Sequence, residues 1–486
     1  SSISSYGYYD LSGGTFQTSG IIAGGNDDGA GIVNQTGGAV TITSAAMTDG
    51  GLRIGHSGSG LGVYNLTGGT CTVNRFYVSI GGSSTRGPSG QLNVGGTGQF
   101  TIVAQEGDAG YLRVGYNNPS HGNVNLATGG VLTVPWIQSG DGVTSTTAST
   151  TSAVNFHGGT LRANMDQADF MRQINAYVYG EGAKIDTDGF NVTINSNLLA
   201  PTDYGVGSIA LADGGSGYVG PPAVKITGGS GTGATAIANV AGGVVTGITV
   251  TNPGSGYESE DVLTVAILGG GAATAGAVDT ISLNSGNLSG GLEKSGEGTL
   301  TLAGANTYAG VTQVKAGELA VTGSLAGDVV LDAGAALLGT GMIGGSVIAP
   351  DDSEVAPGMS VGTISIDGNV MLAGALTIEY EFDDVLEDEV FDSLNVTGDL
   401  DITGASLAFT DIQEGGTTLD NGAYVFARYG TLNGTFDMVS GLPTGYVIDY
   451  AYEGNAIAIT VIPEPSTAVL LTLLLTGLGL RRRERV

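Results

Sequence analysis

Short runs in which apolar and polar residues alternate, each closed by glycine, dominate the first 200 residues of the chain. The longer run lies at residues 33–42 and returns at 64–73, 92–102, 124–134 and 154–161. A shorter run lies at residues 52–56 and returns at 77–81 and 112–116. Alternation over about five positions predicts short strands with one buried face. Helical periodicity is nearly absent, and residues 167–179 form the only modest helix candidate.

The regular spacing of these runs predicts a solenoid. Each longer run contains a turn glycine, and these glycines follow one another at steps of 31, 27, 34 and 29 residues: Gly37, Gly68, Gly95, Gly129 and Gly158. A period of this kind is typical of a unit that stacks on its own copies. Two or three strands per step therefore predict the coils of a parallel β-helix, in which glycine supplies the positive φ of the corners.

Two residue types within the runs refine this prediction. Asn65, Asn93 and Asn125 fall at the same place in three successive runs, which predicts a ladder of stacked side chains along the solenoid. Cys71, the single cysteine, lies on the apolar side of its run, so we expect a small core residue rather than a nucleophile. One cysteine also excludes an intramolecular disulfide.

Composition narrows the functional classes. The 486 residues include 88 glycines without a strict three-residue period, which excludes collagen, and 41% are apolar, which argues against a disordered chain. Acidic residues outnumber basic residues 45 to 15, giving a formal charge of −30. Nucleic-acid binding needs clustered Lys and Arg, so we expect no nucleic-acid partner.

The character of the chain changes at residues 201–280. The sequence Gly-Ser-Gly-Tyr occurs at residues 215–218 and again at 254–257, and a strand-like run lies between the two copies at 244–250. This segment resembles a Gly-Ser-Gly-Tyr repeat module found inserted in bacterial and phage surface proteins. The resemblance implies a Gly-rich β module and no specific activity.

A second resemblance begins at residue 292. Residues 292–302, 304–310 and 314–319 closely resemble the autotransporter-associated β-strand repeat, and residues 184–192 and 356–364 fit passenger regions of that class. The resemblance implies a right-handed parallel β-helix that displays or builds surface material.

The last 24 residues form a three-part segment. Pro463, Glu464 and Pro465 precede an apolar stretch at 468–480, and the basic residues Arg481, Arg482 and Arg483 follow it. A helix over the stretch would be about 20 Å long, short of the roughly 30 Å hydrocarbon layer, so it predicts a marginal membrane anchor. The arginines would stay on the cytoplasmic side and place the rest of the chain outside the inner membrane.

This ending resembles the PEP-CTERM sorting signal. The resemblance implies that the protein is exported and that an exosortase, a membrane protease, removes the helix. The implied partners are the exosortase and the export machinery, with transient inner-membrane contact through the C-terminal helix. We therefore expect a protein at the cell surface or in the extracellular matrix.

Together these patterns predict an all-β chain, a parallel β-helix with an inserted Gly-rich β module and a short C-terminal hydrophobic helix. Five segments are expected: 1–200, β-helix with repeats of about 30 residues; 201–280, the inserted module; 281–349, the autotransporter-associated repeat region; 350–462, a further β-solenoid region with an acidic loop; and 463–486, the sorting signal.

Two acidic segments are candidates for Ca²⁺. Asp186, Asp188 and Asn191 place oxygen ligands at alternate positions around Gly189, as hard cations prefer, although Asp-Gly is also an ordinary turn. Residues 379–392 contain eight carboxylates, which we expect to form a solvated loop with loose Ca²⁺ association at most.

Candidate chemistry is otherwise sparse, and we expect no enzyme. The carboxylates of the first 200 residues show no spacing that brings them beside a basic partner, and the three histidines have no Ser or Cys partner at an informative spacing. The leading hypothesis is a non-enzymatic structural protein of the cell surface or matrix, with self-assembly into fibres as an extension. The alternatives are an adhesin that binds extracellular polysaccharide and, less favoured, a β-helix polysaccharide lyase or hydrolase.

Overall fold

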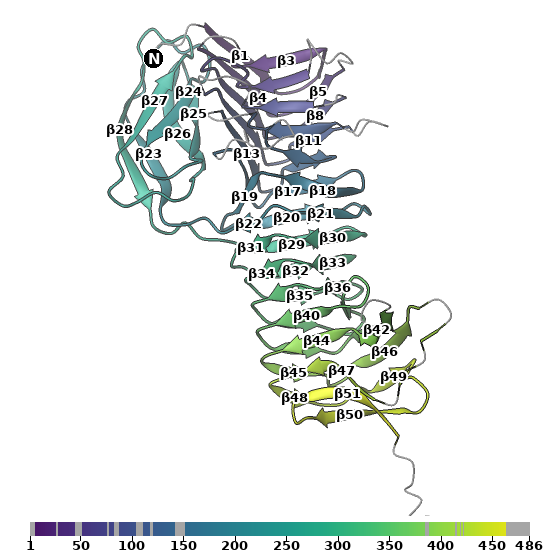
Figure 1. Ribbon diagram of the computed structural model, residues 1–486. Helices are drawn as coiled ribbons and strands as arrows, with labels where there is room; N and C mark the ends of the chain where they lie inside the picture. The colour runs from purple at the N-terminus through teal and green to yellow at the C-terminus, as the bar shows by residue number, and fades with distance from the viewer. Residues whose placement is uncertain are drawn as a thin grey trace, which may run out of the picture.

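The protein is a long stack of short strands with a second β unit packed on its side (Figure 1). The computed structural model describes residues 5–25, 28–43, 51–74, 77–81, 87–103, 110–116, 120–140, 151–383, 388–413, 416–417, 419–420 and 422–462. Within these ranges all regular structure is β, and no helix occurs. The prediction of an all-β chain with parallel strands is confirmed, whereas the predicted C-terminal helix lies outside the described residues.

The helix candidate at residues 167–179 is wrong. It forms two strands, β18 (Gln167–Arg172) and β19 (Asn175–Val178). The pairing of β18 with its neighbour is irregular, and the adjacent residues Phe170 and Met171 are both buried. Two adjacent buried residues break the alternation of buried and exposed positions that a strand normally shows. The resulting spacing of apolar residues resembles that of a helix.

The strands of the stack run in turn through three faces, so that each coil adds one strand to each face and pairs with the next coil. Nearly all of these pairs are parallel. Face 1 consists of β1 (Ser5–Leu11), β4 (Gly29–Gln35), β7 (Leu61–Leu66), β10 (Ser89–Val94), β13 (His121–Ala127), β16 (Ala153–His157), β19 and β22 (Leu198–Leu199), followed by β31 (Ala305–Asn306), β34 (Ser324–Leu325), β37 (Met342–Ile343), β40 (Thr363–Ile366), β44 (Ser393–Val396), β47 (Ala423–Arg428), β51 (Ala456–Val461) and β50 (Tyr446–Tyr452).

Faces 2 and 3 run the length of the stack without a break. Face 2 consists of β2 (Thr15–Thr18), β5 (Ala39–Ile42), β8 (Thr70–Val73), β11 (Gln99–Ile102), β14 (Val131–Val134), β17 (Thr160–Ala163), β20 (Ala183–Asp186), β29 (Leu292–Ser295), β32 (Thr312–Val314), β35 (Val329–Leu331), β38 (Val347–Ala349), β41 (Val370–Leu372), β45 (Asp399–Asp401) and β48 (Thr431–Asn433). Face 3 consists of β3 (Gly20–Ala23), β6 (Gly51–Ile54), β9 (Tyr77–Ile80), β12 (Tyr111–Val114), β15 (Ile137–Gln138), β18, β21 (Val192–Ile194), β30 (Thr299–Leu302), β33 (Glu318–Val321), β36 (Ala336–Gly339), β39 (Glu354–Pro357), β42 (Ala375–Asp383), β46 (Ser406–Asp411) and β49 (Met438–Ser440).

The predicted alternation produces a single apolar column inside the stack. Most strands of faces 2 and 3 show buried side chains at every second position, as in β5, β11 and β14. The buried residues join into one cluster that runs from Leu11 in the first coil to Ile459 near the last. Cys71 belongs to this column and is fully buried, as the sequence predicted.

A module of antiparallel strands interrupts the stack between β22 and β29. Its strands are β23 (Gly205–Asp213), β24 (Ala223–Gly228), β25 (Thr235–Ala241), β26 (Val244–Asn252), β27 (Leu263–Leu268) and β28 (Ala277–Asn284). The stack itself is continuous across this interruption, because β20 pairs with β29 and β21 pairs with β30. The module packs beside the upper half of face 1 (Figure 1).

Most of the described part of the acidic run at residues 379–392 forms strands rather than the loop that we expected. Its first part belongs to β42, which pairs with antiparallel β43 (Asp388–Phe391), and residues 384–387 lie outside the described part of the chain. In β42 the carboxylates alternate with apolar side chains such as Tyr380, whose ring stacks on that of Phe391 at 4.9 Å. Alternation, rather than charge density, decides the local structure here.

Candidate functional site

The three residues predicted to hold Ca²⁺ lie on one turn, and each has bonds within the protein. Asp186 Oδ2 accepts a hydrogen bond from Arg162 Nε at 2.8 Å, and its Oδ1 accepts one from the backbone N–H of Asp188 at 3.0 Å. Asn191 Oδ1 accepts from the N–H of Thr299 in the following coil at 2.9 Å. These bonds give the turn a role in stacking, and the Ca²⁺ site there stays a prediction.

The acidic run contributes one buried carboxylate. Asp392 is fully buried, and its two oxygens accept the backbone N–H groups of Gly362 at 2.7 Å and Glu379 at 2.8 Å. Burial raises the pKa of Asp392 to about 7, although these two bonds act in the opposite direction. Asp392 lies between β43 and β44, and its carboxylate therefore connects this point to β42 and to the turn before β40. No group of three or more His, Cys, Asp or Glu side chains with metal-binding geometry occurs in the described ranges.

The repeat region contains a buried lysine that the alternation did not reveal. Lys294 points into the apolar column, where its partners in register are Ile185 above and Val314 below. Its Nζ donates to the carbonyl oxygens of Gly296, Gly298 and Ala316 at 2.5, 2.8 and 2.7 Å.

Those carbonyls belong to the corners that join faces 2 and 3 in two successive coils. The ammonium therefore ties one corner to the next. The position of Lys294 at an inward place of its strand, between Leu292 and the glycine-rich corner, is the signal from which the contact could have been inferred.

The asparagine ladder is confirmed, and it is longer than the sequence predicted. Four side-chain bonds of 2.5 to 2.9 Å connect five successive coils of face 1, through Asn34, Asn65, Asn93, Asn125 and Asn155. The ladder lies on the outer side of face 1, where the inserted module covers it.

The module is held to face 1 by polar and apolar contacts. Gln91 and Asn125 donate to Thr251 and Thr235 of the module at 2.6 and 3.0 Å. Near one end, the outer apolar residues of β4 and β7 pack against Ala223, with Ile237 and Leu268 at the margin. Face-1 strands are consequently buried on both sides over this region.

A groove of about 490 Å³ remains between the module and face 1. The lining from face 1 of the stack includes His121 and Gln91. The lining from the module includes Lys225, Thr235 and Tyr257. Burial and the positive charge of Lys225 lower the pKa of His121, so the imidazole is neutral at pH 7.

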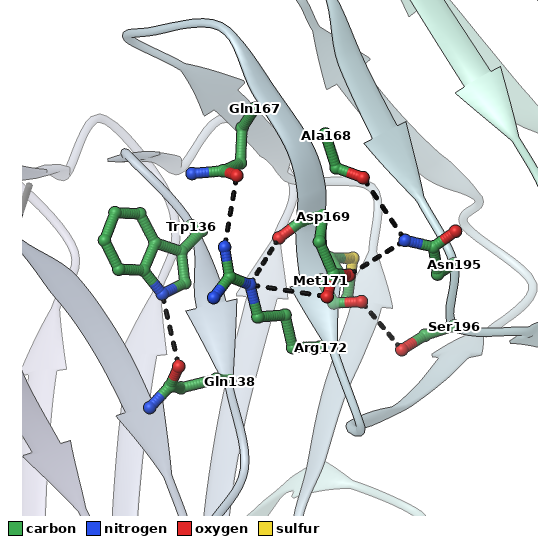
Figure 2. Close-up of polar contacts among 9 residues, drawn as sticks. All are labelled: Trp136, Gln138, Gln167, Ala168, Asp169, Met171, Arg172, Asn195 and Ser196. Carbon is green, nitrogen blue, oxygen red and sulfur yellow. Dashed lines mark hydrogen bonds and ion pairs between the residues drawn. The ribbon is translucent and has the colours of Figure 1, made fainter. Parts of the chain in front are cut away.

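A second polar cluster lies on face 3, where Arg172 joins several side chains (Figure 2). Arg172 Nη2 donates to Gln167 Oε1 at 3.1 Å, and its Nε lies 3.4 Å from Asp169 Oδ2. The guanidinium carbon lies 5.0 Å from the centroid of a Trp136 ring.

The ring of Trp136 is stacked on that of Tyr111 with an angle of 8° between the planes. Its indole N–H donates to Gln138 Oε1 at 3.3 Å. The lone tryptophan is thus part of a stacked column, between an aromatic ring and a guanidinium.

The two ends of the stack differ in their edges. Within the described part of the chain, β1, β2 and β3 are the outermost strands of the first coil, and β48 and β49 are the outermost strands of faces 2 and 3 in the last coil. On face 1 the antiparallel pair β51 and β50 closes the sheet. Among the described residues, the lower edge includes two exposed apolar side chains, Met438 (70% exposed) and Val439 (40%).

The predicted sorting residues Pro463, Glu464, Pro465 and the arginines 481–483 lie outside the described residues. In the part of the chain that the structure describes, no helix is long and apolar enough to span a membrane.

Comparison with known proteins supports the second resemblance. The family model of the passenger-associated-transport-repeat matches residues 292–321, which include Lys294 and its corner partners. The chain is 46% identical over 77 residues to the extracellular serine protease of Serratia marcescens, covering 16% of this chain and 7% of that protein. It is 33% identical over 153 residues to the Adhesin BmaC autotransporter of Brucella suis biovar 1 (strain 1330), covering 30% of this chain and 4% of that protein.

This chain therefore spans less than a tenth of the length of either relative. The prediction of an autotransporter-associated repeat is confirmed by these matches, within the residues that they cover.

Proposed function

We propose that the protein is an exported bacterial surface or matrix component whose work is structural: a rigid right-handed β-helix, sorted by its PEP-CTERM-like tail. The observation that supports this most directly is the uninterrupted pairing of faces 2 and 3 from the first coil to the last, with a passenger-type repeat within it. Parallel stacking with one continuous core makes a stiff rod. A relative named as an adhesin and one named as an extracellular protease support an exported setting.

A non-enzymatic role is supported by how the described carboxylates are used. Asp186 forms an ion pair and accepts a turn N–H, and Asp392 accepts two backbone N–H groups. Such bonds use both carboxylates to hold turns and strands in place, which favours a structural role for these two residues.

The sorting tail gives the test of this function. We expect the protein recovered from its native cell surface to end near residues 462–465, because exosortase processing removes the apolar stretch. Mass measurement of the C-terminal peptide checks this. Replacing Pro463 and Pro465 together by Ala should leave the tail uncut, while Thr467→Ala should be processed normally. A surface protein that still ends at Val486, or a protein retained in the cytosol, contradicts the proposed sorting.

Assembly into fibres is a second part of this proposal. The edges of β48 and β49 on one copy match the parallel direction of β2 and β3 on another, so a second rod would continue faces 2 and 3. Unpaired strand edges favour such pairing, and a head-to-tail contact that does not close produces filaments.

A charge at the lower edge is expected to stop this assembly. Met438→Lys places an ammonium in the edge strand β49, where it opposes edge-to-edge pairing. Met371→Lys is the matched control, because Met371 is also exposed but lies in β41, in the interior of face 2. Electron microscopy of the purified protein should show filaments for the wild type and for Met371→Lys, and single rods for Met438→Lys. Filaments of equal length in all three proteins, or in none, contradict end-to-end growth.

A further inference from the structure

The corner between faces 3 and 1, beside the Arg172 cluster, forms an open polar groove. The groove has a volume of about 480 Å³ and lies at the turns that follow β18 and β21. Its lining includes the polar side chains of Asp169, Gln173, Asn195 and Asn197, with Leu199 as an apolar element. None of these residues takes part in stacking the apolar column of the rod.

Hydrogen bonds and an ion pair within the protein hold the groove residues in place. Asn195 Nδ2 donates to Asp169 Oδ1 at 3.1 Å, and Arg172 Nε lies 3.4 Å from Asp169 Oδ2 (Figure 2). Asn197 Oδ1 accepts the backbone N–H of Ala305 at 2.9 Å. Both carboxylate oxygens and one atom of each amide are therefore fixed by the protein.

The remaining polar atoms offer both donors and acceptors. Among the described residues, no bond engages Asn195 Oδ1, Asn197 Nδ2 or the side-chain amide of Gln173. An amide oxygen accepts and an amide NH₂ donates, so the groove presents a mixed set of donors and acceptors, of which those of Asn195 and Asn197 are fixed.

A further observation distinguishes this corner from the equivalent corners of the first four coils. After β3, β6, β9 and β12, the first residue of the turn has positive φ and is glycine in each case: Gly24, Gly55, Gly81 and Gly115. After β18 the residue in that conformation is Gln173, with a φ of 51°. A left-handed conformation is unfavourable for a residue with a Cβ. The coil therefore retains a strained, exposed amide where glycine would relieve the strain, as is typical of functional positions.

We propose that this groove binds a neutral saccharide chain. A sugar hydroxyl donates and accepts at once, which matches the mixture of amide and carboxylate atoms, and the C–H face of a sugar ring matches Leu199. The described lining contains no Lys or Arg to bind an anionic ligand, and its single carboxylate, Asp169, is already paired with Arg172. One carboxylate is also too few for a metal ion, for which hard oxygen ligands are usually several.

Affinity electrophoresis of the purified protein tests this inference. The probes are gels that contain a neutral β-glucan, starch or galactomannan, with polygalacturonate as the acidic comparison. We expect retardation by at least one neutral polysaccharide, and about tenfold weaker binding for Asn195→Ala, the effect of losing about one good hydrogen bond. Asn433→Ala is the matched control, because Asn433 donates to Asp401 on face 2 as Asn195 donates to Asp169, but far from the groove.

A second variant separates binding from folding. Gln173→Gly relieves the left-handed strain, so its melting temperature should equal or exceed that of the wild type while its binding is also about tenfold weaker. The inference is overturned if no neutral polysaccharide retards the protein, if only polygalacturonate does, or if both groove variants bind as the wild type does. The structural role proposed above does not require an occupied groove, so a surface-displayed rod that binds no saccharide would contradict this inference alone.

Discussion

Gly62→Ala is expected to lower the free energy of unfolding by at least about 3 kcal/mol, because the added methyl group has nowhere to go. A Cβ built on Gly62 would lie closer than 3.0 Å to the backbone atoms Gly55 N and Ala23 O. Gly55 begins the corner after β6, Ala23 ends β3, and the N–H of Gly55 donates to the carbonyl oxygen of Ala23 at 2.8 Å. Neither atom can move aside without breaking this coil-to-coil bond. Chemical denaturation followed by far-ultraviolet circular dichroism measures the loss.

A glycine at the same position of another coil provides the control for Gly62→Ala. Gly7, Gly31 and Gly62 are register partners on β1, β4 and β7, so they occupy one position in three successive coils. We call this set of aligned glycines the glycine column. Among the described residues, no atom beyond its chain neighbours lies within 4 Å of a Cβ built on Gly7. Gly7→Ala should therefore change the stability by less than about 0.5 kcal/mol. Equal losses in the two variants would show that the close approach of the corners is not what requires glycine.

This glycine column shows how far sequence reasoning reaches. The composition predicts corners with positive φ, and Gly55, with a φ of 67°, is such a corner. Gly62 has another role, since its φ is not left-handed and its Cβ would collide with a corner of the preceding coil. Periodicity predicts which residues turn, but a contact between a strand and a corner of another coil depends on register in three dimensions.

The location of the inserted module illustrates the same limit. The Gly-Ser-Gly-Tyr repeats indicate a separate β unit, and nothing in the alternation of that segment specifies which surface it covers. The relevant signal lies in the rod: β7 has the sequence Leu-Gly-Val-Tyr-Asn-Leu, with apolar Leu61 and Val63 on its outer side. Outward apolar residues on a strand with one buried face indicate a second covering surface.

The saccharide groove could not be predicted from spacing, because its residues are separated in sequence by a full coil. Asp169 lies in β18 and Gln173 directly follows that strand, whereas Asn195 and Asn197 lie in the turn after β21. The irregular pairing between these two strands sets how they approach. A repeat argument treats all coils as equal, so it misses that Gln173 adopts the left-handed conformation that glycine has at this corner in the first four coils.

The buried lysine supplies the second large expected effect. Lys294→Ala is expected to lower the free energy of unfolding by about 3 kcal/mol, since it removes a long buried side chain and the donor for three carbonyls. Gly298 O also accepts the N–H of Glu318, so the oxygens of Gly296 and Ala316 are the ones left without a donor among the described residues. Lys294→Met fills most of the volume and should cost about half as much.

Lys315→Ala is the matched control for this loss. Lys315 lies next to the same corner, but its side chain is 44% exposed and its ammonium forms an ion pair with Asp332 at 3.4 Å. Exposed ion pairs contribute little, so the change should be below about 1 kcal/mol. If Lys294→Ala and Lys315→Ala lowered stability equally, the role assigned to the buried ammonium would be wrong.

The pH dependence of stability distinguishes the charge of Lys294 from its volume. Burial lowers the pKa of Lys294 from 10.5 to about 8, against the opposing effect of Glu297, Asp186 and Glu318. Between these two values the unfolded chain binds a proton that the folded protein has released, so the free energy of unfolding rises with pH. Below about pH 8 both states are protonated and this contribution is constant. Relative to Lys294→Met, the wild type should therefore gain about 2 kcal/mol between about pH 7.5 and 9.5, and the titration of the tyrosines cancels because both proteins contain the same ones. Parallel profiles for the two proteins would show that the three carbonyls keep the ammonium charged throughout, with a pKa near its ordinary value.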